Sequence, residues 1–304
     1  MFDEDFNIGE GDGICECLRT YFFDAMKPPI ALFLILSLIA SSQVYATTPV
    51  MDWHFSPEVQ TSHQEPVKLW LSEVQSGLQR MLGPPPIGYD IHIKHRASNK
   101  SPVPWAHTMK GPRRQVHFFI DPRHEWSQFR ADWTAAHELT HMLFPYLGRD
   151  RWFAEGIASY LQYQVMFAAG HMTWQTAITR IQGRFDRVAA SRVPEKWSVL
   201  KHNRRLRQQP DFPRLYWGGA AYFAIVDRRL WQSHEMRLAD VIQKYTQCCF
   251  TTSRKRATDM IRVFDRISET DIFLTTYREE MLTDGVPNTE GVSAWLEEHP
   301  PELE

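Results

Sequence analysis

The stretch Ala135–Phe144, which reads Ala-Ala-His-Glu-Leu-Thr-His-Met-Leu-Phe, decides the fold. The surrounding residues 127–144 contain no Gly or Pro and carry large apolar side chains at helical spacing, so we expect one helix there. Residues four apart lie on one face of a helix, so His137 and His141 can both reach one metal ion. Glu138 lies beside that ion and can accept a proton from the attacking water. This arrangement predicts a zinc-dependent hydrolase.

A second block, Trp152–Tyr160, reads Trp-Phe-Ala-Glu-Gly-Ile-Ala-Ser-Tyr and offers a third ligand. Catalytic zinc usually has three protein ligands and one open position. Glu155 follows His141 by 14 residues and lies on an amphipathic segment, 152–164. Two antiparallel helices joined by a short turn would bring it back beside the histidines. We therefore predict His137, His141 and Glu155 as ligands of one Zn²⁺ ion per chain. The alternative is a chance motif, whose buried His pair would need hydrogen-bond partners on an apolar helix face.

The two blocks together resemble the gluzincin metallopeptidases. They are most similar to the aminopeptidase N and glycyl aminopeptidase families, whose second block reads Trp-x-x-Glu-Gly-x-Ala-x-Tyr. The resemblance covers the middle third of the chain and, more loosely, the C-terminal helices. It implies a zincin-like, thermolysin-type catalytic domain of the α+β class, a zinc ion held in part by Glu155, and a peptide or protein substrate.

Two features depart from the aminopeptidase N pattern. The interval from His141 to Glu155 is shorter than is usual in that family. No Gly-x-Met-Glu-Asn sequence, which in that family recognises the free amino terminus of the substrate, precedes the first block. The choice between endopeptidase and aminopeptidase activity therefore stays open.

A third block, 215–227, predicts a helix entrance of small residues followed by an apolar helix. Glycyl aminopeptidase-like enzymes carry Tyr-x-Lys-Gly at a similar place. Tyr216 matches that tyrosine and Gly219 the glycine, whereas Gly218 replaces the lysine. The resemblance implies that the Tyr216 phenol donates a hydrogen bond to the developing oxyanion. Simple packing of Tyr216 at a helix start is the alternative, and Tyr222 is the competing tyrosine. The predicted catalytic residues are thus Glu138 and Tyr216.

The rest of the chain predicts one zincin-like domain over 47–304, with a small mixed sheet and the active helix in 65–165 and a mainly helical half in 166–304. Apolar spacing predicts a helix over 66–82, and alternation predicts strands at 89–93 and 115–121. Either 105–109 or 115–119 could be the edge strand beside the substrate, and the sequence does not choose between them.

The N-terminal segments carry a targeting pattern. Residues 1–25 are acidic and irregular, and form either an extension or a mis-assigned start ahead of Met26. Residues 26–46 have a short basic start, an apolar core and a small residue at the end, which predicts a signal peptide. We expect export to the periplasm or the extracellular space. The alternative is a tether to the inner membrane through residues 30–46.

Composition excludes some classes of partner and site. A formal net charge of -2 indicates no nucleic-acid binding. The basic runs 201–207 and 254–256 are interpreted as solvated faces or loops and not as binding patches. Cys248 and Cys249 are adjacent, and because the ring of such a disulfide is strained we expect two small buried thiols that do not bridge.

Two functions of different classes fit these observations. The first is hydrolysis of peptide bonds at the zinc ion, with Glu138 as the proton carrier. The second is an exported zinc-bearing binding or scaffold protein of the same fold without peptidase activity. A structural zinc site usually has four protein ligands, so a fourth ligand in the structure would favour the second function.

Overall fold

A computed structural model of the chain describes residues 51–111, 113–190, 198–205 and 211–303. These residues belong to one packed unit, Thr47–Glu304. The predicted extension 1–25 and signal peptide 26–46 lie outside the described residues. Within the described ranges, no helix is both long and apolar enough to cross a bilayer.

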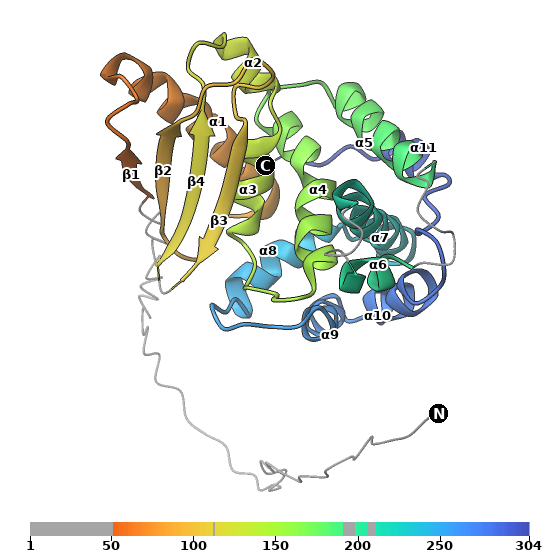
Figure 1. The fold of residues 1–304 in the computed structure, drawn as a ribbon. Helices are drawn as coiled ribbons and strands as arrows, with labels where there is room; N and C mark the ends of the chain where they lie inside the picture. The colour runs from red at the N-terminus through yellow and green to blue at the C-terminus, as the bar shows by residue number, and fades with distance from the viewer. Residues whose placement is uncertain (1–50, 112, 191–197, 206–210, 304) are drawn as a thin grey trace, which may run out of the picture. The chain divides into compact units, whose positions relative to one another are not determined.

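The N-terminal part of the described chain contains a four-stranded mixed sheet (Figure 1). Its strands, in spatial order, are β1 (Met51–Phe55), β2 (Tyr89–His95), β4 (Arg114–Ile120) and β3 (Trp105–Lys110). The first three are parallel, and β3 runs antiparallel to β4. The edge strand beside the active helix is therefore β3, the first of the two candidates. Strand β1 lies ahead of residue 65 and was not expected from the sequence.

The two faces of the sheet differ because side chains alternate along each strand. Ile91, Ile93 and Val116 are buried under helix α1 (Thr61–Leu82), whose Trp70 packs edge-on against Phe118 of β4. The apolar stripe of α1 confirms the helix predicted over 66–82, with an additional turn at its N-terminus. The opposite face of the sheet carries polar residues and a row of histidines.

The predicted single helix over 127–144 is two helices. Helix α2 (Trp126–Ala131) ends before Asp132, and α3 (Thr134–His141) begins after it. Asp132 has an extended backbone (φ -82°, ψ 129°), and its carboxylate accepts a hydrogen bond from the backbone N–H of Thr134 at 2.8 Å. The helical periodicity holds on both sides of this point, but the extended backbone of Asp132 interrupts the helix. Helix α3 remains long enough to hold both histidines on one face.

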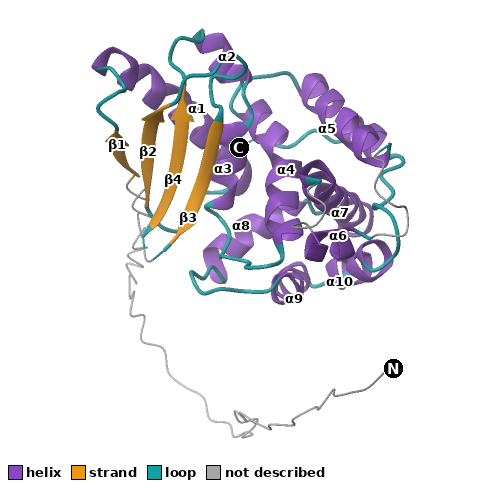
Figure 2. Cartoon of the chain, viewed as in Figure 1, coloured by secondary structure: helices purple, strands orange, loops and turns teal. Residues whose placement is uncertain are grey.

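The helical half completes the fold (Figure 2). Helix α4 (Arg151–Ala168) packs against α3 on one side and α7 (Phe212–His234) on the other. The other helices are α5 (Trp174–Ala189), α6 (Val199–Arg205), α8 (Leu238–Cys248), α9 (Ala257–Ser268), α10 (Ile272–Thr276), the π-helix η1 (Tyr277–Met281) and α11 (Val292–Glu298). A small mixed sheet followed by a mainly helical region confirms the α+β prediction.

The prediction for the two adjacent cysteines is wrong. Cys248 and Cys249 form a disulfide and are exposed, because α8 ends at Cys248 and the non-helical backbone of Cys249 lets the two sulfurs meet. In the described part of the basic run 201–207, Arg204 and Arg205 are exposed, as expected for a solvated face. Residues 201–205 belong to α6, and His202 is buried there.

Candidate metal centre

The three predicted ligands converge on one point. Helix α3 presents His137 and His141 on the same face, and α4 presents Glu155 from its first turns. Glu155 Oε2 lies 3.1 Å from His137 Nε2 and 3.4 Å from His141 Nε2, and the two Nε2 atoms are 3.2 Å apart. Both histidines are buried, and Glu155 is partly exposed. A helix–turn–helix arrangement thus brings together residues from two separate sequence blocks.

These distances fit a tetrahedral metal ion. Zinc bonds of about 2.0–2.2 Å at tetrahedral angles place neighbouring ligand atoms about 3.3 Å apart. The three observed separations of 3.1, 3.2 and 3.4 Å match that value. Two imidazoles and one carboxylate are also a donor set that zinc accepts. Among the described residues, no fourth His, Cys, Asp or Glu joins the group.

A glutamine that the sequence analysis missed orients one of the histidines. Gln162 Oε1 lies 3.0 Å from His137 Nδ1, two turns along α4 from Glu155, and its side chain is buried. A ring N–H donated to Gln162 leaves Nε2 as the lone-pair nitrogen that faces Glu155. Ser159, one turn beyond Glu155, has a buried hydroxyl for which the described residues supply no hydrogen-bond partner. The i, i+7 spacing of Glu155 and Gln162 on one helix face is the signal that could have identified Gln162.

Charge around the site favours an anionic Glu155 and a basic Glu138. Burial alone would raise the pKa of Glu155, but His141 and His137 hold it well below its usual range. Burial raises the pKa of Glu138, and the carboxylate of Glu155 acts in the same direction, although the two histidines oppose the shift. Glu138 is therefore a stronger base than an exposed carboxylate, as proton transfer from a water molecule requires.

Tyr216, not Tyr222, lies at the cluster. The Tyr216 ring stacks on His137, with ring centroids 5.9 Å apart and planes 25° apart. Burial and the nearby carboxylates of Glu155 and Glu138 raise its pKa, so the phenol keeps its proton and can donate a hydrogen bond. Tyr222 is fully buried, and its hydroxyl donates to the Phe273 carbonyl at 2.8 Å. Tyr216 lies in the second turn of α7 and not at its start, because α7 already begins at Phe212 with Asp211 as its N-cap.

Two glycines allow α4 and α7 to approach closely enough for Tyr216 to reach the cluster. A Cβ atom on Gly219 would lie 2.1 Å from the Trp152 carbonyl oxygen, and one on Gly156 would lie 2.5 Å from the Gly219 carbonyl carbon. Both obstacles are backbone atoms, which cannot rotate away. Gly156 and Gly219, one from each of the two sequence blocks, are thus needed for the helix contact.

A half-buried lysine ties the edge strand to the end of the active helix. Lys110 Nζ of β3 donates to the carbonyls of His141 at 2.6 Å and Phe144 at 2.8 Å. Burial lowers the pKa of Lys110 to about 7, and nearby Arg114 acts in the same direction. A cation at a helix C-terminus is favourable because the last carbonyls lack helical partners. The predicted strand at 105–109 stopped one residue before this lysine.

A second group of possible ligands lies on the outer face of the sheet. His54, Asp90 and His92 also bring their ligand atoms within 4.8 Å of one another. However, Asp90 already accepts a hydrogen bond from Arg113 Nε at 2.6 Å, and the guanidinium would repel a metal ion. The His54 and His92 rings stack with centroids 4.5 Å apart, so their in-plane lone pairs run side by side. Both contacts argue against a metal ion at this group.

Comparison with known proteins identifies the fold. No family model matches the sequence, and no curated protein matches it. An aminopeptidase N family protein from Idiomarina loihiensis matches 85% of this chain and 46% of its own, at 13% identity and a TM-score of 0.53.

Structures of an M1 zinc metallopeptidase from Deinococcus radiodurans also match. The enzyme matches 77% of this chain and 49% of its own, at 14% identity and a TM-score of 0.47. A mutant bound to a Tyr-Ser-Ala substrate gives 13% identity and a TM-score of 0.48 over the same shares. The present chain thus spans about half the length of these proteins. The match to the aminopeptidase N family protein shows that the chain shares the fold of about half of that protein, as the two sequence blocks indicated.

Proposed function

We propose that the protein is a zinc-dependent peptidase. The observation that carries the proposal is the convergence of His137, His141 and Glu155 at tetrahedral ligand distances, with Glu138 adjacent to them. Three ligands on two packed helices leave one position open among the described residues. An open position is the mark of a catalytic zinc site, because substrate and water need access to the metal.

Each side chain then has a defined task. Zinc supplies Lewis acidity, which lowers the pKa of water and polarises the scissile carbonyl. Glu138 accepts the proton of the attacking water and delivers it to the leaving amine. The Tyr216 phenol donates a hydrogen bond to the oxygen on which negative charge develops. Gln162 holds His137 in its ligand tautomer, and Lys110 holds the end of α3 in place.

Strand β3 supports the assignment of a peptide as the substrate. It is an edge strand, and among the described strands it pairs only with β4. Its other side therefore offers backbone N–H and C=O groups to an extended chain, as in other cases of β-strand addition. Strand β3 also contacts α3, so a peptide added there would run beside the active helix. We propose that this edge aligns the scissile bond with the zinc site.

A zinc-bearing binding or scaffold protein is the alternative. Such a protein has no use for a half-buried carboxylate with a raised pKa beside the metal, whereas a peptidase requires a base there. The absence of a fourth ligand among the described residues also speaks for catalysis. Endopeptidase and aminopeptidase activity remain equal candidates, because no group in the described site is dedicated to a free amino terminus.

The Glu138→Gln variant tests the proposal. The substitution keeps the shape and the metal ligands but removes the base, so zinc should stay bound while turnover falls by about a thousandfold. Zinc content and cleavage of a mixed peptide library would be measured on the mature chain from Thr47. Glu65→Gln is the matched control, because Glu65 is an exposed residue of α1 far from the ligands in sequence.

Each outcome has a distinct meaning. Cleavage by the wild type and the control but not by Glu138→Gln supports the peptidase, and the cleavage positions separate endo- from exopeptidase activity. One zinc ion without cleavage by any form supports the binding protein. A chain that binds no zinc contradicts the metal site itself.

We also propose that the protein is exported through the signal peptide at 26–46. The proposal rests on the sequence pattern of a basic start, an apolar core and Ala46 at its end. Sequencing the N-terminus of protein recovered from the periplasm or the medium would test it. A mature start near Thr47 is expected. An intact N-terminus in a membrane fraction would support the tethered alternative.

A further inference from the structure

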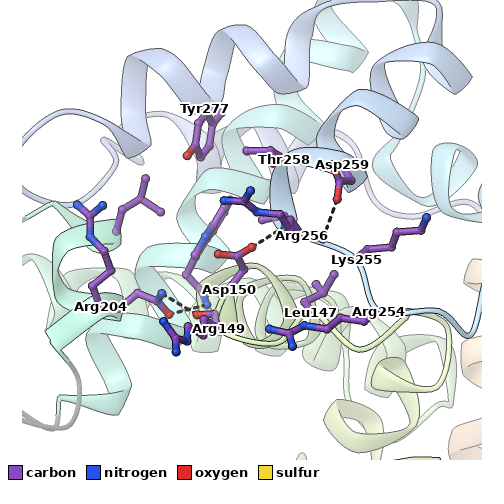
Figure 3. A pocket seen from close by; sticks show the side chains of 14 residues that line it. Leu147, Arg149, Asp150, Arg204, Arg254, Lys255, Arg256, Thr258, Asp259 and Tyr277 are labelled. Atoms are coloured by element: carbon purple, nitrogen blue, oxygen red, sulfur yellow. Dashed lines mark hydrogen bonds between the residues drawn. The ribbon is translucent and has the colours of Figure 1, made fainter. Parts of the chain in front are cut away.

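The helical half contains a cavity of about 590 Å³ whose walls are basic (Figure 3). It is lined by the loop between α3 and α4, by α6, and by the segment that enters α9. Its cationic residues come from all three elements and are Arg149, Arg204, Arg254, Lys255 and Arg256. None of the predicted zinc ligands lines it, nor does Glu138 or Tyr216. The cavity is therefore separate from the metal centre.

The acidic residues of the cavity are already engaged. Asp150 Oδ2 accepts the backbone N–H of Ala257 at 2.8 Å, and Asp259 Oδ2 accepts that of Arg256 at 3.0 Å. Both bonds are drawn in Figure 3. Five cationic side chains thus face two carboxylates. Among the described residues, none of the five forms an ion pair, so the cavity carries an excess of positive charge.

Hydrogen bonds hold the three basic segments in position. The amide of Asn203 on α6 donates to the Arg149 carbonyl at 2.9 Å and accepts from the backbone N–H of Trp152 at 3.3 Å. The backbone N–H of Lys255 donates to the Tyr146 carbonyl at 3.0 Å, and the Arg254 guanidinium lies over the Tyr146 ring. The backbones that carry the cations are therefore preorganised before any ligand binds.

The hydroxyl of Tyr277 adds a neutral hydrogen-bond donor to the basic groups of the cavity. Burial and the nearby Asp150 raise the pKa of Tyr277, although Arg204 and Arg256 act in the opposite direction. The phenol therefore stays protonated and can donate a hydrogen bond. Leu147 and Trp152 add apolar surface to the wall. Several charged donors, the hydroxyls of Tyr277 and Thr258, and an apolar wall are typical of a site for a small ligand.

We propose that this cavity binds a polyanion that carries phosphate groups. Guanidinium groups donate paired hydrogen bonds that match the geometry of phosphate oxygens, and such charge-assisted bonds are the strong ones. Four arginines from three segments can surround more than one phosphate. The volume also exceeds that of a single inorganic ion and lies in the range of ligand pockets, about 300–1,000 Å³. Arg204 from one basic run and residues 254–256 from the other thus contribute to one site and do not form independent solvated faces.

Pyrophosphate binding to the zinc-loaded mature chain tests the proposal by calorimetry. The Arg254→Gln/Arg256→Gln double variant should bind pyrophosphate at least about tenfold more weakly, because two charge-assisted contacts are lost. Arg262→Gln/Arg266→Gln is the matched control, since both arginines are exposed on α9 and the change in net charge is identical. Zinc content is measured before and after titration, because pyrophosphate can chelate zinc.

A second arm identifies the source of the phosphate. Vesicles of phosphatidylglycerol and phosphatidylcholine are compared with vesicles of phosphatidylcholine alone. Binding of pyrophosphate that depends on Arg254 and Arg256 supports a soluble ligand, and vesicle binding with the same dependence supports a lipid headgroup. Equal weakening in both double variants, or no binding of either probe, overturns the proposal. Peptide cleavage does not enter these readouts, so the site and the peptidase assignment can fail independently.

Discussion

The His137–His141–Glu155 group and the His54–Asp90–His92 group contain almost the same donors, yet they differ in every other respect. The first lies between packed helices, with ligand atoms 3.1–3.4 Å apart. The second lies on the outer face of the sheet, where His54 Nε2 is 3.6 Å from Asp90 Oδ1. In the first group, Gln162 fixes one ring, whereas in the second Arg113 occupies the carboxylate.

The difference shows that donor identity does not by itself make a metal site. Helical i, i+4 spacing tilts two rings toward one point, and a second helix adds the carboxylate at that point. Histidines paired across neighbouring strands instead stack face to face, as His54, His92, His117 and His107 do along one row of the sheet. Convergent lone pairs distinguish the first group, whereas in the second the Asp90 carboxylate is paired with Arg113.

The largest expected effect comes from deleting one ligand of each group. His141→Ala should weaken zinc binding by at least about a thousandfold, because one of three protein ligands is lost. His92→Ala should leave zinc affinity unchanged. Competition with a chelator of known affinity measures both values. A similar loss of zinc affinity in the two variants would contradict this difference and would indicate a second metal site at His54, Asp90 and His92.

The next effect concerns the helix contact that carries the first group. Gly219→Ala should lower the free energy of unfolding by about 3 kcal/mol, since its Cβ would meet the Trp152 carbonyl oxygen. Gly183→Ala on α5 is the control, because a Cβ atom added at Gly183 would meet nothing within 4 Å. That change should be neutral or stabilising by up to about 1 kcal/mol. Denaturant unfolding of the two variants checks the difference, and equal effects would refute the role assigned to close packing.

Gln162→Leu tests the hydrogen bond between Gln162 and His137, the contact that positions a ring of the first group. The substitution frees the His137 ring, so zinc affinity should fall by about tenfold, within the range known for such supporting contacts. Gln164→Leu is the matched control, because Gln164 is also buried on α4 but donates to the Tyr160 carbonyl. Chelator competition again gives the affinities. If both variants keep wild-type affinity, Gln162 does not position the ligand.

The smallest effect should come from the histidine row. Burial lowers the pKa of His117 to about 4 from an ordinary value of 6.5, and neighbouring His92 acts in the same direction. The unfolded chain therefore binds more protons than the folded chain between these two pH values. Stability should rise as pH increases from about 4 to 6.5. Above that range His117 is neutral in both states, so it should no longer change stability with pH.

Variants of the row separate this contribution from that of other groups. His117→Gln should flatten the slope of unfolding free energy against pH, whereas His95→Gln, at the exposed end of β2, should leave it unchanged. Urea unfolding at several pH values measures the slope. An unaltered slope in His117→Gln would show that the row does not oppose protonation.

Much of the site could be predicted because its parts are local. The His-Glu-x-x-His spacing and the apolar periodicity around it placed two ligands and a base on one helix face. The Trp-x-x-Glu-Gly block placed Glu155 on the next helix. The missed features depend on contacts between segments far apart in the sequence or on a local change in backbone conformation. Asp132 splits the predicted helix, Lys110 reaches α3 from the edge strand, and the Cys248–Cys249 disulfide forms where α8 ends.

The sequence by itself determined the identity of the donors. It also determined most helices and strands and the position of the motif on a helix, because these follow from periodicities of about 3.6 and 2 residues. Only the tertiary structure decided which edge strand flanks the active helix, which tyrosine meets His137, and that Gln162 supports it. It also brought Arg204 and the basic run at 254–256 to one cavity. Contacts between distant segments depend on how helices and sheet pack, and Gly156 and Gly219 control that packing through backbone atoms that no local pattern records.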